Sequence, residues 1–103
     1  MNIVYLDSTK SDLAWYRTYY SSIFPAGAGR AAAGYMKAIT TLMDHPLVGR
    51  IVADGSTRRF PIRHTPFSIF YRVTEQSIEV VRIWDQRADP KKLELHEEAI
   101  PFL

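Results

Sequence analysis

The sequence predicts an α+β fold in the order β-α-α-β-β-β, in which an antiparallel meander sheet is covered on one face by a helix hairpin. Three observations support it. Residues 2–6 are rich in β-forming side chains, apolar residues recur at helical spacing between residues 9 and 44, and strand-like runs follow from residue 58. A block of helices followed by a block of strands is typical of this class. At 103 residues the chain is expected to form a single domain, 1–103.

Two helices are expected, spanning roughly 9–24 and 30–44. Thr9, with Asp12 three residues later, resembles a capping box at the start of the first helix. A proline and two glycines separate the helices, and we expect that stretch to be a flexible linker rather than a phosphate loop, since it follows a helix and not a strand. The residue before a proline disfavours helical geometry, so His45-Pro46 ends the second helix. The short connection predicts an antiparallel hairpin.

Three strands are expected at residues 58–63, 67–73 and 77–84, and short turns between them favour an antiparallel meander. The leading strand is expected to join the same sheet. Alternation along the second strand places one set of residues on each face: Ile69, Tyr71 and Val73 against Ser68, Phe70 and Arg72. In the third strand this alternation is less regular, because Ile78 and Val80 share one face and Val81 and Ile83 the other. A β-bulge or burial on both faces would explain that pattern.

The chain contains no cysteine, which excludes disulfides and thiolate metal sites and favours a reducing cytoplasm. Its N-terminus lacks the basic and apolar regions of a signal peptide, and no stretch approaches the roughly 20 apolar residues of a membrane-spanning helix. The three histidines, at positions 45, 64 and 96, are too scattered to predict a metal site. We therefore expect a cytoplasmic protein without a metal or cofactor.

Charge is distributed unevenly along the chain. Residues 48–92 carry nine Lys or Arg against five Asp or Glu, a net charge of +4, whereas residues 93–103 carry three Glu and no Lys or Arg. Seven of the nine cations are arginines, whose forked guanidinium suits phosphates and carboxylates. The basic block indicates a polyanionic or acidic partner, although an ordinary solvated surface would look similar.

Three segments carry a family resemblance: HPLVGR (45–50), RRFPIRHTPFSIFYRV (58–73) and IEVVRIWDQRADP (78–90). Their order and spacing resemble the RelE/ParE superfamily of small bacterial toxins. That family's last strand usually ends in a His, with an Arg and a Pro shortly after it. Here Arg87 and Pro90 are present, but Asp85 stands where the His is often found.

The resemblance implies the RelE/ParE fold and a toxin of a type II toxin–antitoxin module, with a ParD- or RelB-like antitoxin as its partner in a hetero-oligomer. Two actions share this fold. RelE-like members cut messenger RNA on the ribosome, and ParE-like members poison DNA gyrase. The fold by itself does not choose between them.

A nuclease needs an acid, a base and cations that hold the phosphate. Arg63, Asp85 and Arg87 are the candidate catalytic residues for that activity. Ser68 stands where a RelE-like cation would be and Leu93 where a late Tyr would be. With three such positions changed, we expect a ParE-like gyrase poison, which requires a binding surface but no acid–base pair.

The resemblance places the target-binding surface on the basic sheet and its C-terminal flank. Its candidate residues are Arg50, Arg58, Arg72, Arg82, Trp84, Arg87, Lys91 and Lys92. Tyr16, Tyr19 and Tyr20 are expected in the core and helix-packing surface, and are candidates for antitoxin contact. A third possibility is an inactive relative that acts as a binding module, with Phe70 and Trp84 stacking on bases beside Arg72 and Arg82.

Overall fold

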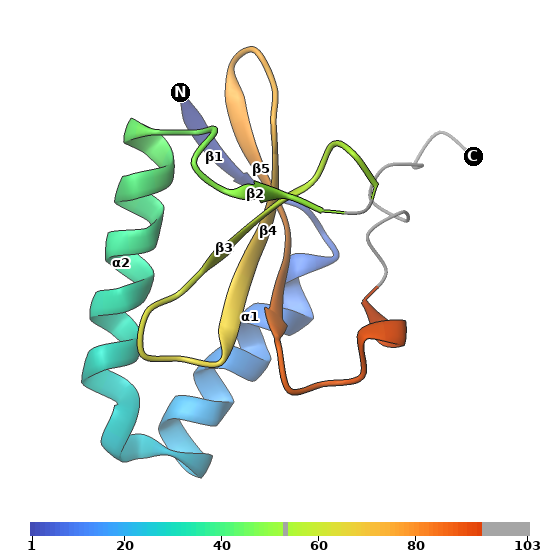
Figure 1. Cartoon of the computed structure of the whole chain (residues 1–103). Helices are drawn as coiled ribbons and strands as arrows, with labels where there is room; N and C mark the ends of the chain where they lie inside the picture. Colours follow the sequence, from blue (N-terminus) through green and yellow to red (C-terminus); the bar gives the residue numbers. More distant parts are fainter. Residues whose placement is uncertain (53, 94–103) are drawn as a thin grey trace.

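The computed structural model describes residues 1–52 and 54–93 (Figure 1). The helices and strands, in chain order, are β1 (Asn2–Tyr5), α1 (Thr9–Thr18), a π-helical turn (Tyr19–Ile23), a 3₁₀ turn (Pro25–Gly27), α2 (Ala28–Asp44), β2 (Arg50–Ile51), β3 (Arg58–Pro61), β4 (Phe67–Val73), β5 (Ser77–Asp85) and a second 3₁₀ turn (Pro90–Lys92). The predicted order is confirmed, with one addition: the two-residue strand β2 is too short to show in the sequence pattern.

One five-stranded sheet, in the order β1-β5-β4-β3-β2, forms the centre of the fold. The leading strand joins it, as expected. However, β1 pairs with β5 in parallel, through Asn2 opposite Ser77 and Tyr5 opposite Val80, whereas the other neighbours are antiparallel. The sheet is therefore mixed rather than purely antiparallel. The helix hairpin reverses the chain between β1 and the meander, and so allows the parallel pairing.

The hairpin of α1 and α2 covers one face of the sheet, with α1 behind β4 and β5 and α2 beside β3 (Figure 1). The first helix extends to about the predicted end, but only Thr9–Thr18 is α-helical, and the five residues that follow form a π-helical turn. The expected linker is ordered as a 3₁₀ turn, and α2 begins at Ala28 rather than at residue 30. The connection between the two helices is therefore shorter than predicted.

The core lies between the hairpin and the sheet. It joins helix residues to alternate strand residues, and its buried members are Tyr20, Ala31, Ala38, Leu42, Ile62, Phe67, Ile69, Tyr71, Ile78, Val80 and Ile83. Ile69 and Tyr71, which the alternation places on the same face of β4, are both part of this core. On the opposite face of β4, Ser68 and Phe70 are also buried.

A β-bulge in β5 explains the irregular alternation of that strand. Phe70 pairs with Arg82 and Tyr71 pairs with Val80, so Val81 is the extra residue. Because of the bulge, Val80 and Ile83 both reach the helix-covered face although three positions separate them. The bulge alternative is confirmed.

The start of α1 is attached to the free edge of β5. Thr9 Oγ1 donates a hydrogen bond to the Val80 carbonyl at 2.8 Å, and Asp12 Oδ2 accepts the backbone N–H of Ile83 at 2.9 Å. The helix has no side-chain cap, so the predicted capping box is wrong. The same two polar residues instead bond backbone groups of β5 at Val80, the last residue that β1 pairs with, and at Ile83 beyond it.

Neither α1 nor α2 has the length and apolar character that a membrane-spanning helix needs.

Candidate functional site

Asp85, Arg87 and Tyr19 form one cluster where β5 meets the end of the first helix. The Asp85 carboxylate accepts hydrogen bonds from Arg87 Nε at 3.0 Å and from Arg87 Nη2 at 2.8 Å. Arg87 Nη1 also donates to the Tyr19 hydroxyl at 3.0 Å, and the guanidinium carbon lies 4.9 Å from the centroid of the Tyr19 ring. Arg87 is therefore held in one orientation while about half of its side chain stays exposed.

This arrangement determines the charge of Asp85. The side-chain hydrogen bond from Arg87 lowers the pKa of Asp85 below its ordinary value of 3.8, despite an opposing contribution from burial. The same pairing raises the pKa of Arg87. At neutral pH Asp85 is therefore an ionised acceptor, and it is poorly suited to donate a proton or to act as a general base near pH 7.

Acid titration should reveal this pair in the stability of the protein. Because the folded-state pKa of Asp85 is lowered, its contribution is present above the unfolded-state pKa and is lost as the pH falls through the folded-state pKa. We expect Arg87→Met to lower the urea midpoint at pH 7, and the difference from the unchanged protein to shrink as the pH falls below about 4. A difference that stays constant from pH 7 into this acid range would contradict the assignment.

The three candidate catalytic residues do not form one constellation. Arg63 follows β3 and lines a groove beside α2, together with Lys37, whereas Asp85 and Arg87 are engaged with each other and with Tyr19. Ser68, at the position of a RelE-like cation, is 1% exposed. The geometry provides anion-binding groups without a neighbouring acid–base pair.

Several candidate target-binding residues have partners within the fold. Arg82 makes a two-pronged contact with Asp12, at 2.7 Å from Nε and 3.0 Å from Nη2, and its guanidinium lies over the Trp84 ring at 4.9 Å. Arg72 pairs with Glu79 across the sheet at 3.5 Å.

The remaining candidates divide into two groups. Arg58 donates to the carbonyls of Leu47 and Gly49, and so holds the loop after α2. Arg50, Lys91 and Lys92 are exposed. Among the candidate target-binding residues, the exposed cations are therefore Arg87, Lys91 and Lys92 after β5 and Arg50 in β2. They do not extend across the whole sheet.

The tyrosine cluster is mainly structural. Tyr16 and Tyr20 pack edge-on with each other, and the Tyr16 hydroxyl donates to the Ala31 carbonyl at 3.0 Å. Burial raises the pKa of the Tyr16 hydroxyl. Tyr19 is half-buried beneath Arg87, and Tyr20 lies in the core, so these rings offer little surface to an antitoxin.

The burial of Phe70 bears on the predicted binding module. Phe70 is only 3% exposed. It therefore cannot stack on a base together with Trp84, as the sequence interpretation expected.

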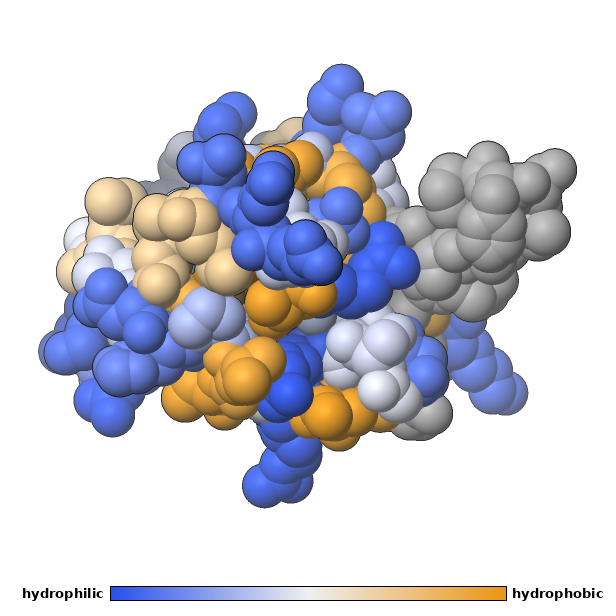
Figure 2. Space-filling view, turned by 90° about the horizontal axis from the view of Figure 1, so that it is seen from above, coloured by the Kyte–Doolittle hydropathy of each residue, from blue (hydrophilic) through white to orange (hydrophobic). Residues whose placement is uncertain are grey.

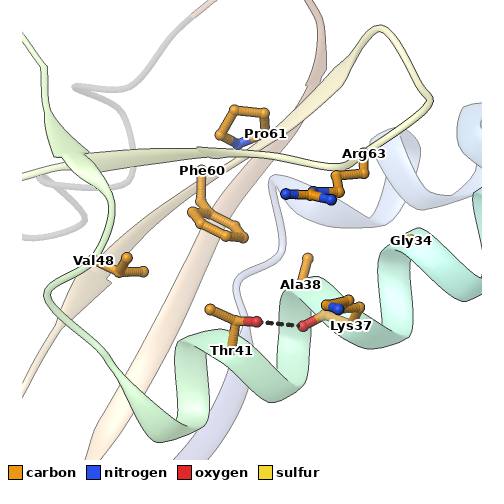
Figure 3. A pocket seen from close by; sticks show the side chains of 8 residues that line it. All are labelled: Gly34, Lys37, Ala38, Thr41, Val48, Phe60, Pro61 and Arg63. Carbon is orange, nitrogen blue, oxygen red and sulfur yellow. Dashed lines mark hydrogen bonds between the residues drawn. The ribbon is translucent and has the colours of Figure 1, made fainter.

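A groove between α2 and β3 was missed by the sequence interpretation. Figure 3 shows its lining residues, which enclose a volume of about 390 Å³: Gly34, Lys37, Ala38, Thr41, Val48, Phe60, Pro61 and Arg63. The signal that could have revealed it is a stripe of small residues on one face of the helix, Gly34, Ala38 and Thr41. Within residues 1–52 and 54–93, no group of three His, Asp or Glu side chains is placed to hold a metal ion.

Comparisons with known proteins agree with this architecture. Residues 3–90 match the family model of the ParE toxin of the type II toxin–antitoxin system parDE. No curated protein matches the chain. Among solved structures, a chain of the chromosomal ParDE toxin–antitoxin system from P. aeruginosa is similar, with a TM-score of 0.62 and 26% sequence identity. The match covers 81% of this chain and 92% of that one.

Proposed function

This chain belongs to the ParE toxin family of type II toxin–antitoxin systems, and from that premise we propose that it poisons DNA gyrase and is neutralised by a cognate antitoxin. The RelE/ParE resemblance of the sequence and the fold it implied are confirmed. We propose gyrase rather than the ribosome as the target, and the cytoplasm as the place of action.

The observation that carries the choice is the state of Asp85. Its carboxylate is occupied by Arg87, and its pKa is lowered, so the position where related toxins often carry a His has no proton to donate at neutral pH. RNA cleavage by attack of a 2′-hydroxyl needs proton transfer as well as phosphate binding, and loss of a general acid or base typically costs ~10²–10⁴-fold in rate. Binding to gyrase or to its DNA makes no such demand.

The exposed cations are suited to binding. Arg87 presents a fixed guanidinium, and Lys91 and Lys92 follow it on the same flank, while Arg50 lies at the opposite edge of the sheet in β2. Such groups attract DNA phosphates or acidic protein surfaces. We propose that the flank formed by Arg87, Lys91 and Lys92 contacts the gyrase–DNA complex.

A supercoiling assay tests this proposal. Purified protein is expected to inhibit gyrase or to trap cleaved DNA, and Arg87→Ala to weaken that effect by about tenfold or more, because the side chain contributes both charge and contact area. Arg30→Ala is the matched control, since Arg30 is an exposed arginine on α2 and is not one of the three residues of this flank. Thermal unfolding of each variant separates loss of contact from loss of fold. In cells, induction should produce filaments and DNA-damage signalling while messenger RNA stays intact at early times.

The competing outcome is equally concrete. Early codon-specific cleavage of messenger RNA on ribosomes, abolished by Arg63→Ala or Asp85→Ala, would replace the gyrase proposal with a RelE-like nuclease. If the protein neither inhibits gyrase nor cleaves messenger RNA, the result would favour an inactive relative that acts only as a binding module.

A further inference from the structure

The groove between α2 and β3 has the size and lining of a small-molecule site. Figure 3 shows the Phe60 ring projecting into it from β3, with Arg63 extending over it from the turn that follows. Its volume of about 390 Å³ lies near the lower end of the ~300–1,000 Å³ that is typical of ligand pockets. The lining also has the usual composition of such pockets, since a few polar groups stand among apolar ones.

The turn after β3 fixes the backbone at Arg63. Thr65 Oγ1 donates a hydrogen bond to the Ile62 carbonyl at 2.9 Å within this turn. On the helix side, a Cβ at Gly34 would lie 2.7 Å from the carbonyl oxygen of Arg63, so α2 lies directly against the turn. His64 has a φ of 63°, in the left-handed region that residues other than glycine seldom adopt. Such a conformation persists where surrounding contacts hold it, and it is frequent at ligand sites.

Two cations line one end of the groove. Lys37 on α2 and Arg63 after β3 are both exposed, and neither Asp nor Glu is among the lining residues that the structure describes. Within residues 1–52 and 54–93, neither cation forms an ion pair. A phosphate monoester carries a charge of about −1.5 to −2 at pH 7, which matches two cations, and its oxygens suit the forked guanidinium of an arginine.

Thr41 adds a directional polar group on the α2 side of the groove. Its Oγ1 donates a hydrogen bond to the Lys37 carbonyl at 2.8 Å, the contact drawn as a dashed line in Figure 3. A hydroxyl has a single hydrogen to donate, so this oxygen is left as an acceptor. The complementary group on a ligand is therefore a hydroxyl or an amino group.

The other end of the groove is apolar. Phe60 is half-buried there, and Val48 is 49% exposed. The adjoining Leu47 and Met43 are 65% and 44% exposed, and the view from above (Figure 2) shows apolar groups among hydrophilic ones at this end of the molecule. An aromatic ring beside exposed apolar groups is a surface on which a flat ring of a ligand stacks.

We propose that this groove binds a nucleoside monophosphate. The phosphate lies between Lys37 and Arg63, a sugar hydroxyl or a base amino group donates to Thr41, and the base packs on Phe60 and Val48. A phosphate, a hydrogen-bond donor and a flat ring together meet the three kinds of group that line the groove. The proposal does not depend on the proposed gyrase activity, because the flank of Arg87, Lys91 and Lys92 does not line this groove.

Titration of the full chain with adenosine 5′-monophosphate (AMP) tests the proposal. We expect AMP to shift the amides of Lys37, Ala38, Thr41 and Arg63. It should bind about tenfold or more tightly than either adenosine or inorganic phosphate, because each of these retains only one of the two main contacts. Added salt should weaken the binding of AMP more than that of adenosine, since only AMP is charged.

Paired substitutions separate the groove from the general charge of the protein. Lys37→Gln combined with Arg63→Gln is expected to weaken AMP binding by about 10- to 100-fold and to leave adenosine binding unchanged. Lys10→Gln combined with Arg30→Gln is the matched control. It removes one lysine and one arginine that are exposed on the helices outside the groove, and it should leave AMP binding unchanged.

Phe60→Leu tests the apolar end. This variant keeps an aliphatic side chain on β3 but loses the flat ring, so it should weaken AMP and adenosine by about fivefold or more without affecting inorganic phosphate. Thermal unfolding of every variant shows whether the fold is kept.

Four results would overturn the proposal. The first is that AMP at millimolar concentration shifts no amide of the groove. The second is that inorganic phosphate or adenosine binds as tightly as AMP, which would leave a simple anion site or a simple apolar site. The third is that the control pair weakens AMP binding as much as the groove pair does. The fourth is that a 5′-phosphorylated oligonucleotide binds the groove more tightly than AMP, which would assign it to a nucleic-acid strand.

Discussion

Replacing Phe67 by alanine is expected to lower the free energy of unfolding by about 3–5 kcal/mol, a large share of the ~5–15 kcal/mol typical of a domain. Phe67 is 1% exposed, and its ring meets those of Tyr16 at 4.9 Å, Tyr19 at 5.8 Å and Tyr20 at 6.2 Å between centroids. Truncation leaves a cavity. The three tyrosine rings cannot move far enough to fill it, because their backbone is held in α1 and in the π-helical turn that follows. Urea denaturation followed by circular dichroism measures the loss.

Met36→Ala is the control for this substitution. Met36 is a large apolar residue on α2 that is 63% exposed, so its truncation should change stability by about 0.5 kcal/mol or less. If Phe67→Ala cost no more than this control, the aromatic cluster would not be the junction between helix and sheet. Phe67→Ala should also impair gyrase inhibition, because Phe67 packs against Tyr19 and the Arg87 guanidinium lies over the Tyr19 ring.

The second large effect is expected from Asp12→Ala. The carboxylate is 10% exposed in its side chain, receives two hydrogen bonds from Arg82, and accepts the Ile83 N–H. Its removal leaves a nearly buried guanidinium without this carboxylate and a buried backbone donor without its acceptor. Breaking one side of a buried pair typically costs about 3–5 kcal/mol. We expect a loss in that range, measured by urea denaturation at pH 7.

A double-mutant cycle with Arg82→Met isolates the pair. The double variant should cost less than the sum of the single variants, because each single change removes the same interaction. Asp7→Ala is the control, since Asp7 also pairs with a cation but has a side chain that is 97% exposed. Additive effects, or a small effect of Asp12→Ala, would show that the attachment of α1 to the β5 edge contributes little to stability.

The helices and strands and their order could be predicted from the pattern of residues along the chain. Both helices, the four strands other than β2 and the faces of β4 follow from the spacing of apolar residues, which depends only on neighbours within a turn or a strand. The irregular alternation of Ile78, Val80, Val81 and Ile83 also indicated the bulge. The motifs between His45 and Pro90 indicated the toxin family for a similar reason, because order and spacing are properties of the chain.

Which polar groups meet depends on how the helices pack on the sheet. Asp12 appeared to be a capping residue, yet its partner is Arg82, 70 positions away, because β1 leaves part of the β5 edge unpaired and α1 crosses it. Arg82 appeared available to a target, yet its guanidinium is paired with Asp12 and its side chain is only 13% exposed. The groove of Lys37 and Arg63 arises from the close approach of Gly34 to the turn after β3. Local patterns record which residues favour a helix or a strand, whereas the partners of charged side chains depend on packing between segments that are distant in the chain, and no local pattern encodes that.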